Sequence, residues 1–217
     1  MIKSFFSTLS YIFHPLFLPT IGLYLLFNLP STSPGLIDLS LYGIDPDLKK
    51  GVYQIFITLL VVAPGLSILI MVWSGMIKSI KMETQEERTY AISVMLIYTI
   101  FCYVYLRYLI ISSSNYDYLL IYLFAITLTL LVSFILNFYV KISLHAIGIF
   151  GVAGALIGYF NNQMNFNIYV LLSILFIGGL ICSGRLFLKA HKSGEVLLGM
   201  AVGFAIEFLC MKFEWFI

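Results

Sequence analysis

Charged residues are scarce in this chain: they make up 10% of its 217 residues, whereas hydrophobic residues make up 61%. A soluble domain is nearer half apolar and a quarter charged. So few charges cannot cover a water-facing surface, and lipid must therefore be the solvent for most of the chain. The net charge of +2 and the lack of a basic run argue against binding of nucleic acid. The length suits one membrane-embedded domain over residues 1–217.

Cysteine and histidine are also rare. The three cysteines, Cys102, Cys182 and Cys210, lie within or at the end of apolar runs and show no metal-ligand spacing. We interpret them as small apolar packing residues. The sequence therefore predicts no metal site and no cofactor.

Long apolar runs account for most of the chain. A helix needs about 20 apolar residues to cross the hydrocarbon core, and backbone groups in lipid must be paired within the helix. The sequence predicts an all-α, polytopic transmembrane bundle with about six or seven spans, over residues 11–29, 52–74, 90–111, 117–139, 144–160, 166–183 and 195–213. Two glycine pairs stand four residues apart inside these spans and predict close helix packing: Gly154 with Gly158, and Gly199 with Gly203.

The first apolar run begins like a signal sequence, because Lys3 precedes it. Pro15 and Pro19 interrupt the run, and no A-x-A cleavage site follows it. We therefore expect residues 11–29 to form an uncleaved first span.

The charged loops lie on one face of the membrane by the count of crossings. Residues 75–89 hold the densest charge in the chain, and residues 184–194 form a second charged stretch. Two predicted spans separate the first loop from Lys141, and two more separate Lys141 from the second loop. An even number of crossings returns a chain to the same side. We therefore expect all three segments at one membrane surface.

Cations and histidines gather on this shared face. Two of the three histidines, His145 and His191, stand there at span boundaries, whereas His14 precedes Pro15 and is interpreted as an ordinary interfacial residue. The cations on the shared face are Lys81, Arg88, Lys141, Arg185, Lys189 and Lys192. Such a cluster suits an anionic lipid headgroup, and phosphate above all.

Spacing suggests separate roles for these residues. Ser143 and His145 open a predicted helix, so the Ser143 hydroxyl can cap the helix or contact an anion. Glu195 follows His191 by four residues, so the two share one face of a continuing helix. Glu195 can then accept the proton of one His191 ring nitrogen and leave the other nitrogen free to attack. This is the logic of a catalytic triad with histidine as the nucleophile.

The order and spacing of these residues resemble the three-part signature of the type 2 phosphatidic acid phosphatase superfamily, which contains membrane lipid phosphatases related to vanadium haloperoxidases. That signature runs K-x6-R-P, then P-S-G-H, then S-R-x5-H-x3-D. This chain has K-METQEE-R-T from Lys81, I-S-L-H ending at His145, and G-R-LFLKA-H-KSG-E ending at Glu195. The similar motifs extend over residues 81–195.

Several positions depart from the signature, although each of its lysine, arginine and histidine positions is retained. Thr89 replaces a proline, and Gly184 replaces a serine that would contact phosphate. Ile142 and Leu144 replace the proline and glycine of the second motif. Glu195 replaces an aspartate and adds one methylene to the orienting side chain.

The resemblance implies metal-independent hydrolysis of a lipid phosphate or diphosphate, without a cofactor. His191 would attack phosphorus to form a phosphohistidine, and Glu195 would orient its ring. His145 would protonate the leaving oxygen and then activate water. The phosphoryl oxygens would be held by Lys81, Arg88, Ser143 and Arg185. Cations placed in this way can do the work of a metal ion in phosphoryl transfer.

Other classes of function stay open or are disfavoured. A catalytically degenerate relative that binds or moves phospholipid headgroups stays open, because Leu144 and Glu195 could each disable hydrolysis and leave binding intact. Magnesium-dependent alcohol-phosphate transferases and prenyltransferases use paired aspartates. By the crossing count, all the aspartates of this chain lie off the shared face: Asp38, Asp45, Asp47 and Asp117. A transporter is disfavoured because the sequence has no repeated halves.

The orientation in the membrane follows from the resemblance more than from charge. Lysine and arginine residues outside the proposed site divide almost evenly between the two faces, so the positive-inside rule gives little direction. The resemblance implies a bacterial inner membrane protein whose site faces the periplasm. The sequence leaves the lipid open among undecaprenyl diphosphate, phosphatidylglycerol phosphate, phosphatidate and a lipid A phosphate. It also leaves the oligomeric state open.

Overall fold

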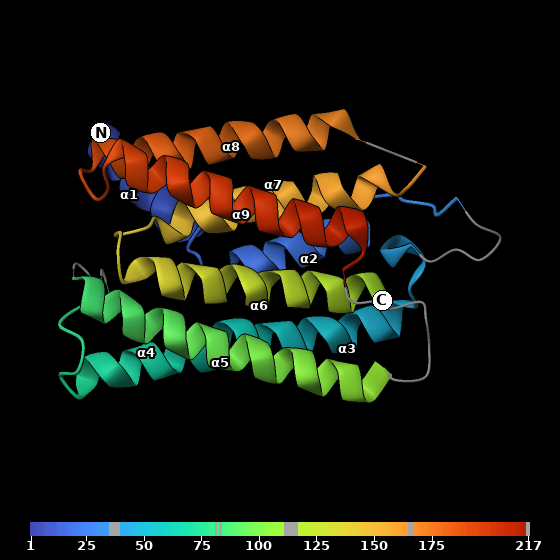
Figure 1. Cartoon of the computed structure of the whole chain (residues 1–217), viewed down its shortest axis with the longest axis horizontal. Helices are drawn as coiled ribbons and strands as arrows, with labels where there is room; N and C mark the ends of the chain where they lie inside the picture. The colour runs from blue at the N-terminus through green and yellow to red at the C-terminus, as the bar shows by residue number, and fades with distance from the viewer. Residues whose placement is uncertain (35–39, 81, 83, 111–116, 165–166, 216–217) are drawn as a thin grey trace.

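The protein is an all-α integral membrane protein, as the sequence predicts. The computed structural model describes residues 1–34, 40–80, 82, 84–110, 117–164 and 167–215, and these residues contain no β-strand. Within them, six helices are long and apolar enough to cross a membrane: Pro46–Trp73, Gln85–Leu109, Asp117–Asn137, Leu144–Asn161, Ile168–Phe187 and Ser193–Phe213. The long helices lie roughly parallel to one another in an elongated bundle (Figure 1).

The N-terminal segment corrects the prediction of a continuous first span over residues 11–29. It forms two short helices, α1 (Ile2–Ile12) and α2 (Leu18–Asn28). Pro15 lies in the break between them, where it lacks an N–H donor and disfavours helical geometry in the preceding residue. Pro19 is tolerated because it stands in the first turn of α2. The 11 residues of α2 extend only about 16 Å, against a hydrocarbon core about 30 Å thick.

The chain nevertheless passes from one end of the bundle to the other through α2. His14, just before α2, lies beside His145 at the start of α7 (Leu144–Asn161), with ring centroids 5.9 Å apart. Ser31, just after α2, has its hydroxyl 2.8 Å from the Tyr159 hydroxyl near the end of α7. The non-helical residues of this passage include the buried Ser31. Irregular backbone at membrane depth is tolerated where protein covers it in this way.

The next crossing is one long helix with a widened turn. It consists of α3 (Pro46–Phe56), the π-helical η2 (Ile57–Val62) and α4 (Ala63–Trp73). Asp45 caps its start, because Oδ1 accepts the backbone N–H groups of Asp47 and Leu48 at 2.9 and 3.2 Å. The π-turn precedes Pro64, whose missing N–H disturbs the regular hydrogen-bond ladder.

The remaining helices alternate in direction and so define two ends of the bundle. They are α5 (Gln85–Ile110), α6 (Asp117–Asn137), α7, α8 (Ile168–Phe187) and α9 (Ser193–Phe213). Figure 1 shows α5, α7 and α9 beginning at the left-hand end, where α4, α6 and α8 finish. We call this the site end and the opposite one the far end. The described residues of the three charged segments therefore lie at one end of the bundle, as the crossing count predicts.

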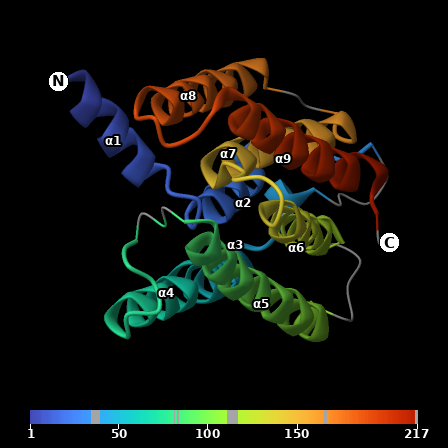
Figure 2. The same ribbon diagram turned by 60° about the vertical axis from the view of Figure 1, so that its left-hand side comes forward.

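Helices α7 and α9 form the tightest pair in the bundle, and they lie side by side in Figures 1 and 2. The glycines make this approach possible, because a Cβ at Gly154 or Gly203 would collide with a backbone carbonyl of the facing helix. A Cβ at Gly158 or Gly199 would lie 2.7 or 2.9 Å from such a carbonyl oxygen. The prediction of close packing through these glycines is confirmed.

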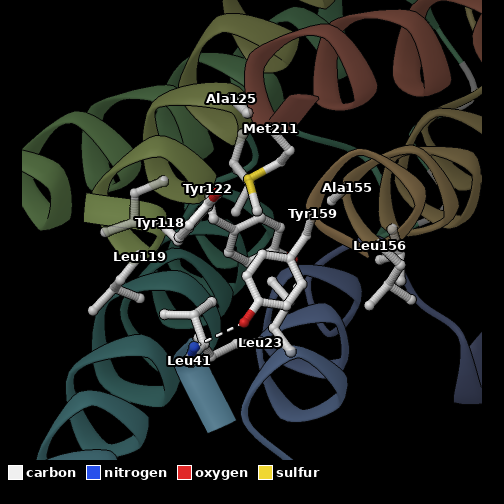
Figure 3. Close-up of a cluster of buried hydrophobic side chains, with 14 of the residues drawn as sticks. Leu23, Leu41, Tyr118, Leu119, Tyr122, Ala125, Ala155, Leu156, Tyr159 and Met211 are labelled. Carbon is white, nitrogen blue, oxygen red and sulfur yellow. Dashed lines mark hydrogen bonds between the residues drawn. The ribbon is translucent and has the colours of Figure 1, made fainter. Parts of the chain in front are cut away.

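A cluster of buried side chains holds the far half of the bundle together. The Tyr159 hydroxyl accepts the Leu41 backbone N–H at 2.8 Å, and the Tyr118 ring packs edge-on against the Tyr159 ring (Figure 3). Met211 from α9 and Leu23 from α2 lie in the same cluster. Because the Tyr159 hydroxyl is paired, the whole ring can be buried without an unmet polar group.

Candidate functional site

The segments at the site end enclose a pocket, here called the basic pocket. Its ionisable lining residues are two arginines and three histidines, and no aspartate or glutamate is among the described residues of its wall. The lining residues are His14, Pro15, Leu16, Ile68, Ile80, Met82, Arg88, Ala91, Met95, Leu144, His145, Arg185 and His191. Four predicted site residues therefore meet there: Arg88, His145, Arg185 and His191.

A capping box at the start of α5 positions Arg88. The Glu87 N–H donates to the Thr84 hydroxyl at 3.2 Å, and Glu87 Oε2 accepts the Thr84 N–H at 3.3 Å. Arg88 follows directly and is buried. Its Nε donates to the Met82 carbonyl at 2.9 Å and its Nη1 to the Ile142 carbonyl at 3.4 Å. The guanidinium thus ties two loops together while it lines the pocket.

The turn between α8 and α9 explains the spacing of Arg185 and His191. The Ala190 N–H donates to the Arg185 carbonyl at 3.0 Å, and the Lys189 N–H donates to the Leu186 carbonyl at 2.9 Å. Lys189 is left-handed, with φ of 53°. This is a Schellman motif, which closes α8 within one turn. It brings the His191 ring back to the pocket beside Arg185, whose Nε is buried without a hydrogen-bond partner in the described chain.

Glu195 holds the His191 ring at the start of α9. Its Oε2 lies 2.8 Å from His191 Nδ1 and also accepts the Lys192 N–H at 3.2 Å. The Lys141 carbonyl lies 3.2 Å from the same Nδ1. Both partners of Nδ1 are acceptors, so Nδ1 carries the proton and Nε2 of the neutral ring has a free lone pair. The hydrogen bond predicted between these two side chains is therefore present.

The neutral form of His191 is favoured strongly. Burial, together with the positive charges of Arg88 and Arg185, lowers the pKa of His191 to about 4 despite the raising effect of the Glu195 hydrogen bond. At neutral pH the ring is therefore uncharged. A neutral ring with a free Nε2 is the form that can act as a nucleophile.

The other two histidines stand against each other across the pocket. His145 Nε2 donates to the Ser10 carbonyl in the last turn of α1 at 3.1 Å, so its Nδ1 is the acceptor in the neutral ring. His14 Nδ1 accepts the Leu16 N–H at 3.4 Å, and burial followed by the charge of Arg185 lowers the pKa of His14. The interpretation of His14 as an ordinary interfacial residue missed this contact. The crossing count could have indicated it, since His14 stands at the start of the run 11–29, and the two predicted spans 11–29 and 52–74 lie between it and residues 75–89.

The other two predicted phosphate ligands are Ser143 and Lys81, and neither is among the described lining residues of the basic pocket. Ser143 occupies the N-cap position of α7, but its hydroxyl makes no capping bond and is buried without a hydrogen-bond partner in the described part of the chain. Of the two roles that the sequence left open for this hydroxyl, capping is therefore not observed; the Ser143 backbone N–H donates to the Glu195 carbonyl at 3.4 Å. Ser143 is not a lining residue of the basic pocket, and its contact with an anion stays a prediction. Lys81 lies outside the described residues.

The departures from the family signature have local packing reasons. The Thr89 hydroxyl accepts a hydrogen bond from Asn137 Nδ2 at 2.9 Å, which links α5 to α6. A Cβ at Gly184 would lie 2.8 Å from Cδ1 of Phe6, so a serine there would crowd α1. Leu144 lines the basic pocket, where its side chain takes up space that a glycine would leave empty.

The charge of the basic pocket suits an anion. In the described ranges, no group of three or more His, Cys, Asp and Glu side chains is arranged to hold a metal ion. Asp45, Asp47 and Asp117 all lie at helix starts of the far end, and Asp38 lies outside the described residues.

No family model, curated protein or solved structure matches this chain.

Proposed function

We propose that the protein is a metal-independent lipid phosphatase that works through a phosphohistidine at His191. One observation carries the proposal: a free Nε2 of His191 shares a pocket with two arginines and with no carboxylate among the described lining residues. The resemblance to the type 2 phosphatidic acid phosphatase signature supports the same chemistry. The phosphate would enter the basic pocket while the lipid tail stays in the membrane.

The proposed reaction has two steps. His191 Nε2 attacks phosphorus and the bond from phosphorus to the lipid oxygen breaks. His145 enters this step protonated on both ring nitrogens and gives the Nδ1 proton to the leaving oxygen, while its Nε2–H stays on the Ser10 carbonyl. Water then attacks the phosphohistidine and gives a proton to His145, and the N–P bond breaks to release phosphate. Arg88 and Arg185, together with Lys81, would stabilise the charge on the phosphoryl oxygens.

The test is phosphate release by purified protein from each of the four candidate lipids, with EDTA present. We expect release from at least one lipid, inhibition by vanadate, and an acid-labile, base-stable phosphohistidine after rapid quench with labelled lipid. His191→Ala should abolish both signals. Lys192→Ala is the matched control, because it removes a nearby positive charge from an exposed side chain, and the bonds of Lys192 to Glu195 are made by its backbone N–H and carbonyl.

A binding or lipid-moving protein without hydrolysis is the second candidate. Two observations favour it. The Leu144 side chain takes up space in the pocket where the signature has glycine, and two of the N–H donors of Arg88 already bind backbone carbonyls. This candidate predicts that the protein binds lipid phosphates and releases no phosphate from any of them. Hydrolysis by the wild type that His191→Ala leaves unchanged would contradict the histidine mechanism.

A further inference from the structure

A buried carboxyl group in the middle of α9 has no role in the proposed hydrolysis. Glu207 is 4% exposed, and its Oε2 has no hydrogen-bond partner among the described residues. Its Oε1 receives one long hydrogen bond of 3.5 Å from the Thr129 hydroxyl. An ionisable side chain inside a membrane span is costly, so its retention points to a function.

Glu207 faces a second cavity, here called the tail cavity, which is walled mainly by apolar residues of α2, α4 to α7 and α9. The tail cavity shares Pro15, Leu16, Met95 and Leu144 with the basic pocket, so the two are neighbours through a common wall. The distance of Glu207 from the basic pocket can be estimated along α7. The Glu207 side chain packs against Gly151, which comes six residues after His145. Six residues of helix correspond to about 9 Å.

The other polar groups of the tail cavity are already paired. The Thr99 hydroxyl donates to the Leu96 carbonyl at 2.9 Å, and the Tyr122 hydroxyl donates to the Pro19 carbonyl at 2.9 Å. No lysine or arginine is among the described lining residues. An ionised carboxylate without a cation is unfavourable in such surroundings, so the cavity suits the neutral acid, which offers an O–H donor.

We infer that Glu207 is a binding site for a hydrogen-bond acceptor in the lipid tail, namely the ester carbonyl of an acylglycerol phosphate. This inference rests on the proposed function, because a phosphate held in the basic pocket fixes how far into the bundle each atom of the lipid tail reaches. An acyl ester places a carbonyl oxygen a few bonds below the phosphate. A polyprenyl chain has no acceptor at that depth and would leave the Glu207 donor unpaired, which costs binding free energy.

The test compares binding of dioleoyl phosphatidate with its dialkyl ether analogue, which has the same headgroup and chain lengths but no carbonyl. Binding to full-length protein in nanodiscs is measured by titration calorimetry. We expect the wild type to prefer the ester about five- to tenfold, the effect of one hydrogen bond of roughly 1 kcal/mol. Glu207→Leu should bring the ratio near one, and Glu207→Gln should retain it through its amide donor. Thr127→Val is the control that leaves it unchanged, because Thr127 lines neither cavity and its hydroxyl donates to the Leu123 carbonyl.

The outcomes separate the inference from the proposed function. Equal binding of ester and ether by the wild type would overturn the role of Glu207, whatever the variants do. Arg185→Ala should weaken both lipids alike, since it removes a headgroup contact. Lipid binding that Arg185→Ala leaves unchanged would instead overturn the basic pocket as the headgroup site. Failure to bind either lipid would overturn the role of Glu207 but not the proposed function, whose other candidate lipids include undecaprenyl diphosphate.

Discussion

One oxygen of the Glu195 side chain, Oε2, accepts two hydrogen bonds. One comes from the His191 ring and the other from the Lys192 N–H. Glutamate at the third position of a helix is the residue whose side chain reaches back to the N-cap N–H. The same reach brings it to the ring of the preceding histidine. The length of this side chain is therefore matched to the backbone that surrounds it, although the family signature has aspartate here.

This match predicts the effect of Glu195→Asp. The shorter carboxylate cannot hold both donors, so the ring of His191 should lose its fixed orientation and turnover should fall. Glu195→Gln should cost up to about 10⁴ in turnover, by analogy with loss of the orienting carboxylate in a triad. Single-turnover phosphohistidine formation measures both variants, and lipid affinity is the control that should change little. An Asp variant faster than the wild type would contradict the match.

The depressed pKa of His191 predicts the acid limb of the pH profile. His191 has a pKa of about 4, so the ring stays neutral as the pH falls through 6.5, the ordinary range of histidine. Below about pH 4 the ring gains a proton at Nε2 and loses its nucleophilic lone pair. We expect kcat/KM for phosphate release to fall with a midpoint near pH 4, as the acid side of a bell-shaped curve. Circular dichroism at each pH serves as the folding control, and a midpoint near 6.5 would argue against His191 as the nucleophile.

At the scale of helices, backbone contact between α7 and α9 fixes the relation between His145 and the His191–Glu195 pair. Both helices start at the site end, and each carries one part of the site in its first turns. The glycines set the distance between the helices, because they leave no side chain between the two backbones. A change in this distance would therefore move the two parts of the site relative to each other.

Gly154→Ala tests this packing. The added Cβ would collide with the Phe204 carbonyl, so α7 and α9 must separate. We expect the variant to be destabilised by about 1–3 kcal/mol, the usual cost of overpacking, and to unfold at a lower temperature in detergent. Gly179→Ala on α8 is the matched control, because nothing lies within 4 Å of the added Cβ there. Alanine favours helix over glycine, so the control should be neutral or slightly stabilised.

At the scale of the whole molecule, the two ends of the bundle should face opposite sides of the membrane. Lys192 lies at the site end, and Lys50 lies near the far end with 73% of its side chain exposed. The native cysteines Cys102, Cys182 and Cys210 are buried. They should therefore give little background in labelling with a membrane-impermeant maleimide.

Cysteine substitutions at these two lysines test the orientation. We expect Lys192→Cys and Lys50→Cys to be labelled from opposite sides, one in intact cells and the other only after permeabilisation. If the resemblance holds, the site-end cysteine is the one labelled from the periplasm. Labelling of both positions from the same side would contradict the arrangement of spans.

Much of the architecture and part of the site follow from short-range features of the sequence. Runs of apolar residues predict the long spans, since unpaired backbone in lipid leaves only the helix. The spacing of Arg185, His191 and Glu195 predicts their meeting, because a Schellman turn and the first turn of a helix place residues a few positions apart side by side. The even number of crossings predicts that these residues share an end with Arg88 and His145.

Only the tertiary structure decided the features that depend on contacts between distant segments. The break at Pro15 turns an expected span into α1 and α2, and thereby brings His14 to the basic pocket beside His145. Packing of α1 on α8 places the Phe6 side chain against Gly184, so the serine of the family signature would be crowded there. Glu207 faces the tail cavity only because helices from across the chain pack around it. The sequence determines which segments become helices, since helix formation depends on neighbouring residues. The shapes of the two cavities between the helices depend instead on side chains that meet only after packing.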